Sequence, residues 1–267
     1  MPLPLAQKIA NLFAELPQVE AVALGGSQAS GTSDSASDID LYVYTRAEIP
    51  LSERQQIVER SGGASRADLG LTYWGPGDEW FDQSTGIEVD IVYFDADWME
   101  SQIQRVLVDC QPSLGYSTCF WHTLRHSQPL YDPHGWFQAL QQRSLQDYPE
   151  ALRRNIINFN LPVLRQIIPS YATQIEKALK RRDLVSLNHR LAALLASYFD
   201  ILFAFNRQPH PGEKRLVEKA LSSCPCLPQD MPADLELVLQ AAATADPALM
   251  THLARLLDRL DQLISLL

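Results

Sequence analysis

Residues 24–41, which read LGGSQASGTSDSASDIDL, decide how the first part of this chain folds. The apolar and β-branched run at residues 19–24 ends at a pair of glycines, and a second run of the same kind occupies residues 39–44. Small polar residues separate the two runs. Such runs on either side of a Gly/Ser-rich segment are typical of neighbouring strands joined by a turn. The pattern therefore predicts a hairpin-like pair of strands.

The glycines and serines of this turn are candidate phosphate-binding residues. Glycine directly after a strand lets backbone N–H groups approach a phosphate closely, and a serine hydroxyl adds a further donor. We therefore expect Gly25, Gly26, Ser27 and Ser37 to contact a nucleotide. An ordinary flexible hairpin turn is the alternative interpretation of the same residues.

Three aspartates supply the candidate metal ligands. Asp38 and Asp40 are two residues apart in a strand, so their side chains project from the same face and repel each other unless a cation lies between them. Magnesium is the expected cation, because it binds one or two carboxylates together with phosphate oxygens and water. Asp90, in a strand predicted at residues 87–94, is the third carboxylate of a two-metal arrangement. A solvated strand face is the alternative, and Glu88 is an alternative general base.

The order and spacing of these elements resemble a known family. The Gly-Gly-Ser turn, the Asp-Ile-Asp pair and the later Val-Asp-Ile strand are similar to the nucleotidyltransferase signature of the DNA polymerase beta-like superfamily, over residues 20–95. A helical C-terminal part makes the chain similar to bacterial small-molecule nucleotidyltransferases, including the aminoglycoside and lincosamide adenylyltransferases, and to related uncharacterised bacterial proteins. Every element of the signature is present.

The resemblance implies a reaction and a set of residue roles. Asp38 and Asp40 are expected to bind Mg2+, and Asp90 either binds metal or acts as general base. Gly26 and Ser27 are expected to hold the triphosphate of ATP or another nucleoside triphosphate. The expected reaction transfers AMP from ATP to a hydroxyl of a small molecule, such as an aminoglycoside-like antibiotic, and releases pyrophosphate. Two alternatives stay open: a protein adenylyltransferase that modifies an antitoxin-like partner, and a nucleotide-binding module without catalysis.

The remaining periodicity divides the chain into two parts. Apolar residues at helical spacing predict helices at residues 3–16 and 51–61, and a further strand is predicted at residues 68–73. After the last predicted strand the pattern is helical and ends in an apolar stripe. We therefore expect an α+β chain, with a polymerase beta-like mixed sheet and flanking helices at residues 1–110. An α-helical bundle that binds substrate or partner is expected at residues 111–267.

Charge is unevenly distributed along the chain. The net charge is −10, with 5 Lys and Arg against 17 Asp and Glu in residues 1–100, and 12 against 6 in residues 150–220. A net negative chain disfavours binding to a nucleic-acid backbone, and the acidic part favours a cationic acceptor such as an aminocyclitol. In the basic part, Lys177 and Lys214 are candidate ligands of the nucleotide phosphates. Solvated helix and loop positions are the alternative for both lysines.

The sequence also bears on the compartment of the protein. No apolar run approaches the roughly 20 residues of a membrane-spanning helix. The N-terminus lacks the basic and apolar regions of a secretion signal. We therefore expect a soluble, cytoplasmic protein whose four cysteines are free thiols. The oligomeric state stays open.

Overall fold

The chain folds into two compact units. The computed structural model describes residues 2–26 and 38–266. Contacts group residues 1–104 and 123–146 into the first unit, and residues 105–122 and 147–267 into the second. The first unit is therefore discontinuous in sequence, because residues 105–122 of the second unit separate its two segments. The division into functional domains expected at residue 110 stays a prediction.

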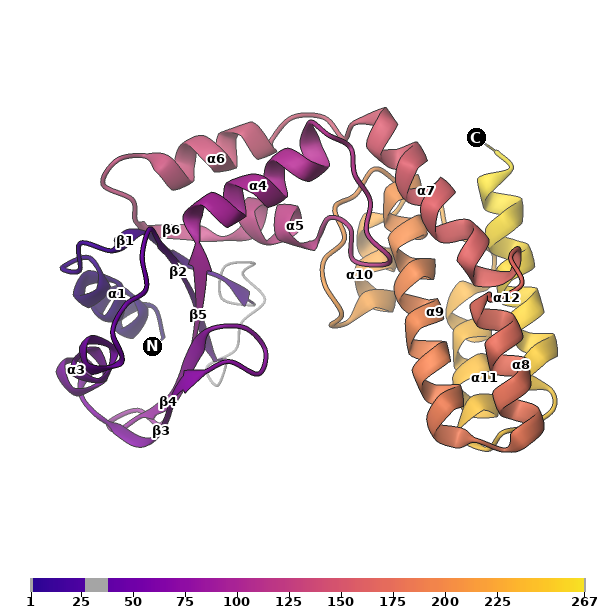
Figure 1. Ribbon diagram of the computed structural model, residues 1–267, viewed down its shortest axis with the longest axis horizontal. Helices are drawn as coiled ribbons and strands as arrows, with labels where there is room; N and C mark the ends of the chain where they lie inside the picture. The colour runs from indigo at the N-terminus through magenta and orange to yellow at the C-terminus, as the bar shows by residue number, and fades with distance from the viewer. Residues whose placement is uncertain (1, 27–37, 267) are drawn as a thin grey trace. The chain divides into compact units, whose positions relative to one another are not determined.

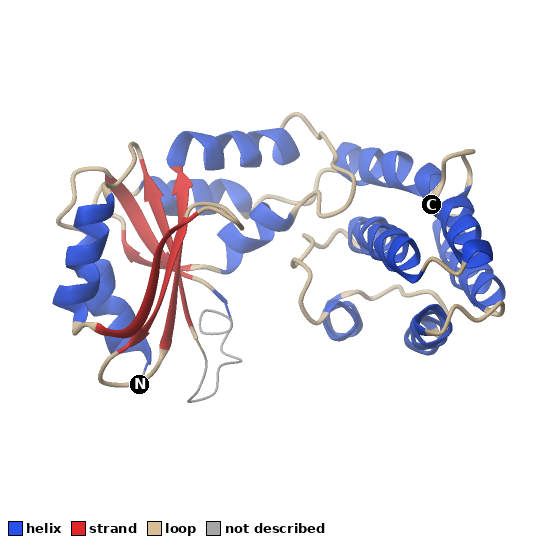
Figure 2. Ribbon diagram, turned by 60° about the horizontal axis from the view of Figure 1, so that its bottom comes forward, coloured by secondary structure: helices blue, strands red, loops and turns tan. Residues whose placement is uncertain are grey.

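A six-stranded mixed sheet forms the centre of the first unit (Figure 2). Its strand order is β3-β4-β5-β2-β1-β6, in which β2 and β5 pair in parallel and the other neighbours pair antiparallel. The antiparallel pairing of β1 with β2 is the hairpin-like pair that the sequence predicts. The strands are β1 (Val19–Leu24), β2 (Ile39–Thr45), β3 (Ala64–Leu71), β4 (Gly77–Asp82), β5 (Glu88–Asp95) and β6 (Gln128–Tyr131).

Two amphipathic helices, α1 (Pro2–Phe13) and α3 (Leu51–Ser61), cover one face of this sheet (Figure 1). Their apolar side chains form one core with alternate residues of the strands, including Ile39, Leu41 and Val43 of β2. Because side chains alternate along a strand, the residues between them belong to the opposite face. That opposite face carries the candidate site.

The opposite face is partly covered near the ends of β2 and β5. The rings of Trp136 and Phe137, in α6 (Trp136–Ser144), pack against Tyr44. Trp98, in α4 (Ala96–Leu107), stacks on Phe94. These contacts involve the late residues of both strands, whereas Asp40 and Asp90 lie near the strand beginnings.

Two strands correct the sequence-based prediction. The pattern after the last predicted strand was interpreted as wholly helical, but β6 forms there. β6 has four residues, including Pro129, and lies at the edge of the sheet, where proline is tolerated because one side of the strand needs no hydrogen-bonding partner. β4 is the second strand that the sequence pattern does not predict. It is rich in acidic residues and shows no alternation of apolar residues, although its Trp80 is buried in the core.

The second unit is helical, which confirms the predicted bundle (Figure 1). α7 and α8 both pack against α9, whose residues from Ser197 to Phe205 are all buried. A helix that is buried all round is mostly apolar, which explains the many large apolar side chains in this part of the sequence, where Asp200 is the one charged residue. The helices are α5 (Cys119–His126), whose beginning belongs to this unit, α7 (Glu150–Arg165), α8 (Tyr171–Arg181), α9 (Leu184–Phe205), α10 (Leu216–Ser223), α11 (Met231–Ala243) and α12 (Leu249–Ile264).

Two further expectations concern the chain as a whole. Cys110, Cys119, Cys224 and Cys226 are all free thiols, as predicted. Among residues 2–26 and 38–266, no helix combines the length and the apolar character that crossing a membrane requires.

Candidate active site

Asp40 and Asp90 lie directly opposite each other on two neighbouring strands. The parallel register of β2 and β5 pairs the two residues, and both are half-buried. Residues paired in this way project from the same face of a sheet at close spacing. Two carboxylates are thereby fixed side by side on the face that α1 and α3 leave uncovered.

The glycine turn after β1 lies against this carboxylate pair. The backbone N–H of Gly25 donates a hydrogen bond of 2.8 Å to the carbonyl oxygen of Asp40. A Cβ atom at Gly26, where φ is +62°, would lie 1.7 Å from Oδ2 of Asp40, and one at Gly25 would lie 2.3 Å from the ring of Tyr42. A side chain at either position would therefore clash, so the backbone itself borders the carboxylate of Asp40.

The electrostatics of this face are dominated by carboxylates. Burial, followed by the negative charges of Asp40 and Asp90, raises the pKa of the Tyr42 hydroxyl to about 12. Burial, followed by the charges of Asp38, Glu79 and Asp40, raises the pKa of Glu88. Asp38 is exposed immediately before β2. The carboxylate charges therefore add to the effect of burial on both pKa values, and a bound cation would oppose that contribution.

The structure adds two acidic residues that the sequence analysis did not assign to the site. Glu79 of β4 is the register partner of Asp90, and Asp68 of β3 is in turn the partner of Glu79. Together with Asp40, these residues form a row of four carboxylates across four strands, which we call the acidic row. A small cavity of about 190 Å³ lies beside it, lined in part by Glu88, Glu79 and Asp68. No signal in the sequence places Glu79 there, because β4 was not predicted and its register depends on tertiary pairing.

The other predicted site residues belong to the second unit or lie outside the described residues. Lys177 is exposed in α8, and Lys214 is exposed just before α10. Both belong to the second unit. Ser27 and Ser37 lie outside the described residues. A nucleotide-binding role for these four residues stays a prediction.

The donor set of the first unit fits a magnesium ion. Magnesium takes oxygen ligands and is commonly held by one or two carboxylates, with water and substrate phosphate completing its shell. Asp40 and Asp90 offer two such carboxylates, and the backbone of Gly26 lies directly against the carboxylate of Asp40, where a Cβ would clash. Within the described part of the chain, no three His, Cys, Asp or Glu side chains already form a complete metal cluster.

The family of the first unit follows from a comparison with protein-family models. Residues 7–67 match the model described as polymerase beta, nucleotidyltransferase, which includes the glycine turn and the Asp-Ile-Asp strand. The chain therefore carries a nucleotidyltransferase domain of the polymerase beta type, and the predicted enzyme class is confirmed. Residues 121–216 match a second model, described as a domain of unknown function (DUF4037).

Two solved structures that match this chain are distant from it in sequence. A nucleotidyltransferase-like protein from Exiguobacterium sibiricum is 12% identical with a TM-score of 0.42, and the match covers 95% of this chain and 71% of that one. An aminoglycoside 6-adenyltransferase from Bacillus subtilis is 11% identical with a TM-score of 0.31, and the match covers 97% and 91%. The comparison with curated proteins gives no significant match. The class of this protein rests on the family match at residues 7–67.

Proposed function

We propose that this protein transfers AMP from ATP to a hydroxyl group of a small molecule and releases pyrophosphate, in a reaction that depends on magnesium. The observation that carries the proposal is the placement of Asp40 opposite Asp90, with the backbone of Gly26 against the carboxylate of Asp40. In a nucleotidyltransferase domain with two carboxylates beside a glycine turn, a metal ion and a triphosphate can bind next to each other.

Each group of this site has a role in the proposal. Asp38, Asp40 and Asp90 hold magnesium, which when bound supplies positive charge to the triphosphate and lowers the pKa of the attacking oxygen. The backbone at Gly25 and Gly26 borders the phosphates, and Ser27 and Ser37 extend this contact. Either Asp90 or its neighbour Glu88 accepts the proton of the acceptor hydroxyl.

The acidic row favours a cationic acceptor. Glu79 continues the line of carboxylates from Asp90 away from Asp40 and adds negative charge beyond the residues that a metal needs, whereas Asp68, the last of the row, pairs with Arg66. A molecule with protonated amino groups, such as an aminoglycoside, is attracted to this face, whereas a polynucleotide is repelled. The hydroxyl to be modified is then presented next to Asp90.

The second unit is proposed to bind the substrate or partner. Lys177 and Lys214 are exposed cations of this unit and are proposed to contact the nucleotide phosphates. Lys177→Ala and Lys214→Ala should each raise the KM for ATP about threefold to tenfold and change the KM for the acceptor less. An unchanged KM for ATP in both variants would assign these lysines to the solvated surface.

The first experiment is a transfer assay with labelled ATP, magnesium and a panel of aminoglycosides and lincosamides, which follows pyrophosphate and labelled acceptor. The test variant is Asp38→Ala/Asp40→Ala. The matched control is Asp97→Asn, because Asp97 is an exposed acid of the same unit that pairs with Arg46. Labelled antibiotic made by wild type and the control, but not by the test variant, supports the proposal. Magnesium-independent binding of ATP without pyrophosphate release points instead to a non-catalytic module.

A protein acceptor is the second candidate. Tyr73 and Trp74, in the turn between β3 and β4, are 83% and 94% exposed, and paired aromatic side chains on a surface favour contact with another protein. Label transferred to a co-purified protein, with none on any small molecule, would support this alternative. Tyr73→Ser/Trp74→Ser should then abolish labelling of the partner and leave pyrophosphate release from a small acceptor unchanged.

A further inference from the structure

The largest cavity that we describe in the first unit lies on the face of the sheet opposite the acidic row. Thr45, Tyr93 and Asp95 line it, and each is an odd number of residues from Asp40 or Asp90 along its strand. Since side chains alternate, they point to the other side of the sheet. The cavity has a volume of about 490 Å³, within the range of small-molecule sites. It is therefore distinct from the candidate active site.

A cationic group forms the base of this cavity. The guanidinium of Arg54, in α3, lies 5.2 Å from the ring centroid of Tyr93 and forms an ion pair of 3.1 Å with Asp78. Only 12% of the Arg54 side chain is exposed. Its Nε–H is buried and has no acceptor among the described residues. Arg54 is the one cationic residue among the described residues that line this cavity, so an anionic group of a ligand would face its guanidinium.

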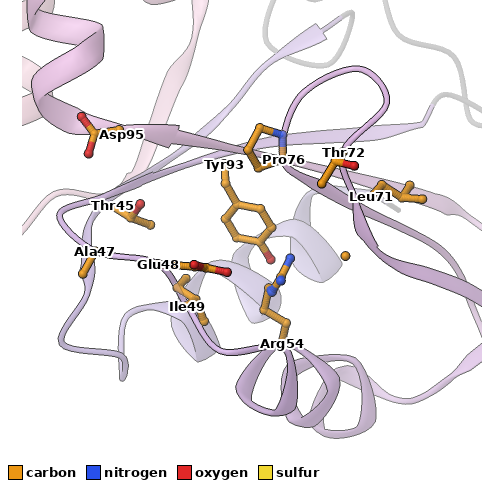
Figure 3. A pocket seen from close by; sticks show the side chains of 11 residues that line it. Thr45, Ala47, Glu48, Ile49, Arg54, Leu71, Thr72, Pro76, Tyr93 and Asp95 are labelled. Carbon is orange, nitrogen blue, oxygen red and sulfur yellow. The ribbon is translucent and has the colours of Figure 1, made fainter.

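A carboxylate faces this cation from the other side. Glu48 is exposed, and its side chain and that of Arg54 both point toward the hydroxyl end of Tyr93 (Figure 3). Within the described residues Arg54 forms its ion pair with Asp78 and not with Glu48. Asp95, also at the rim, accepts a hydrogen bond from the backbone of Trp98, so its carboxylate caps α4. Glu48 is therefore the anion that the cavity presents to a ligand.

Most of the remaining cavity wall is apolar. Ala47 and Ile49 line it from the segment that follows β2, Leu71 from the end of β3 and Pro76 from the turn before β4, while Thr45 and Thr72 add uncharged hydroxyl groups (Figure 3). These residues offer no further charge. A ligand that fits this wall has an apolar body and keeps its charged groups at one end.

We propose that this cavity binds a small zwitterion with an apolar body, which is the chemistry of an α-amino acid with an apolar side chain. The ligand carboxylate faces Arg54, its ammonium group faces Glu48, and its side chain contacts Leu71 and Pro76. The site shares no residue with the candidate active site, so the proposal does not depend on the transfer reaction. It shares β2 and β5 with that site, which places bound amino acid on the same strands as Asp40 and Asp90.

The test is calorimetric titration of the full chain with L-phenylalanine and L-leucine. Hydrocinnamate, which lacks the ammonium group, and phenethylamine, which lacks the carboxylate, are the matched ligands. Loss of either charged contact should weaken binding about tenfold, because a hydrogen bond to a charged group is worth about that factor. Binding of hydrocinnamate as tight as that of L-phenylalanine would overturn the proposal. So would the absence of binding of both amino acids at about 10 mM.

Three variants separate the site from unspecific binding. Ala47→Trp fills the cavity and should abolish binding of L-phenylalanine. Glu48→Gln, at an exposed position, should weaken L-phenylalanine about tenfold and leave hydrocinnamate unchanged. Glu59→Gln is the control, since Glu59 is an exposed acid of α3 outside the cavity. Should Ala47→Trp fail to fold, Glu48→Gln decides, and L-phenylalanine binding equal to wild type in Glu48→Gln overturns the proposal.

Discussion

The two faces of the sheet hold carboxylates in opposite ways. On the face covered by α1 and α3, buried Asp78 accepts hydrogen bonds from Arg54, from the Tyr93 hydroxyl and from the backbone of Gly70. On the other face, the register partners of Asp90 are Asp40 and Glu79, both acidic. Like charges directly opposite each other destabilise a sheet, whereas a paired buried acid holds its surroundings together. The first arrangement serves the fold, and the second is expected to serve a ligand.

The sharpest way to separate the two arrangements is to neutralise an acid of the acidic row. Asp90→Asn should lower the rate of pyrophosphate release about a thousandfold, because one ligand of the metal is lost. The same change removes repulsion with Asp40 and Glu79, so the free energy of unfolding without nucleotide should rise by up to about 1 kcal/mol. The measurements are a pyrophosphate assay and chemical denaturation.

The control for this variant is the same substitution, Asp to Asn, at a position outside the acidic row. Asp97→Asn should retain activity, because Asp97 lies in the first turn of α4 and pairs with Arg46. A lower stability of Asp90→Asn than of wild type, with full activity, would reverse the comparison and make the acidic row a structural feature.

On the opposite face, removal of a partner should damage the fold and leave the chemistry intact. Arg54→Ala strands the carboxylate of Asp78, which is 2% exposed, so the free energy of unfolding should fall by about 3 kcal/mol. Denaturant midpoints measure the loss. Arg54→Met/Asp78→Asn should recover part of it, because the buried charge is gone. The rate of transfer per folded molecule should stay within about twofold of wild type.

The sequence predicted the parts of the fold whose signal is local. Residues 19–24 and 39–44 are apolar runs on either side of a turn, and they form β1 and β2. Asp40 and Asp90 each alternate with buried neighbours, so their common orientation follows from spacing along each strand. Alternation of this kind predicts the structure because the apolar residues of each strand must face the core.

The parts that the sequence did not predict depend on pairing between distant segments. Glu79 becomes a neighbour of Asp90 only through the register of β4 with β5, and Arg54 meets Asp78 only when α3 packs on the sheet. β6 is a four-residue strand with a proline, and it exists because β1 offers it an edge. The register between two strands, and the pairing of a short strand at the edge of a sheet, cannot be predicted from the local sequence pattern of one segment.

The second unit contains a buried carboxylate that differs from both Asp78 and the acidic row. The pH dependence of stability tests this difference. Asp200 of α9 is 1% exposed and accepts hydrogen bonds from the backbone and hydroxyl of Ser117 and from Asn160. Burial raises its pKa to about 7 from 3.8, and these donors oppose the rise. Asp200 has hydrogen-bond donors, as Asp78 has, but no ion pair among the described residues.

The direction of the pH effect follows from the raised pKa. The folded state binds the Asp200 proton more tightly than the unfolded state, so its stabilising contribution is complete below pH 3.8 and is lost as the pH rises through about 7. Asp200→Asn cannot lose a proton. Its stability relative to wild type should therefore rise by about 4 kcal/mol between pH 4 and pH 8. Denaturation series at several pH values measure the difference, and a constant difference would show that Asp200 does not titrate in this range.

The smallest expected effect concerns the outer end of the acidic row. Glu79→Gln leaves Asp40 and Asp90 in place, so the KM for ATP should not change. The KM for an aminoglycoside should rise about fivefold at low salt, because the attraction to a protonated amino group is weakened, and the difference should shrink as ionic strength screens the charges. Initial rates at two salt concentrations, with a neutral hydroxyl acceptor as control, separate attraction from catalysis. An equal loss of activity with both acceptors would contradict this prediction. It would mean that Glu79 acts by positioning Asp90 for catalysis and does not attract the cationic acceptor.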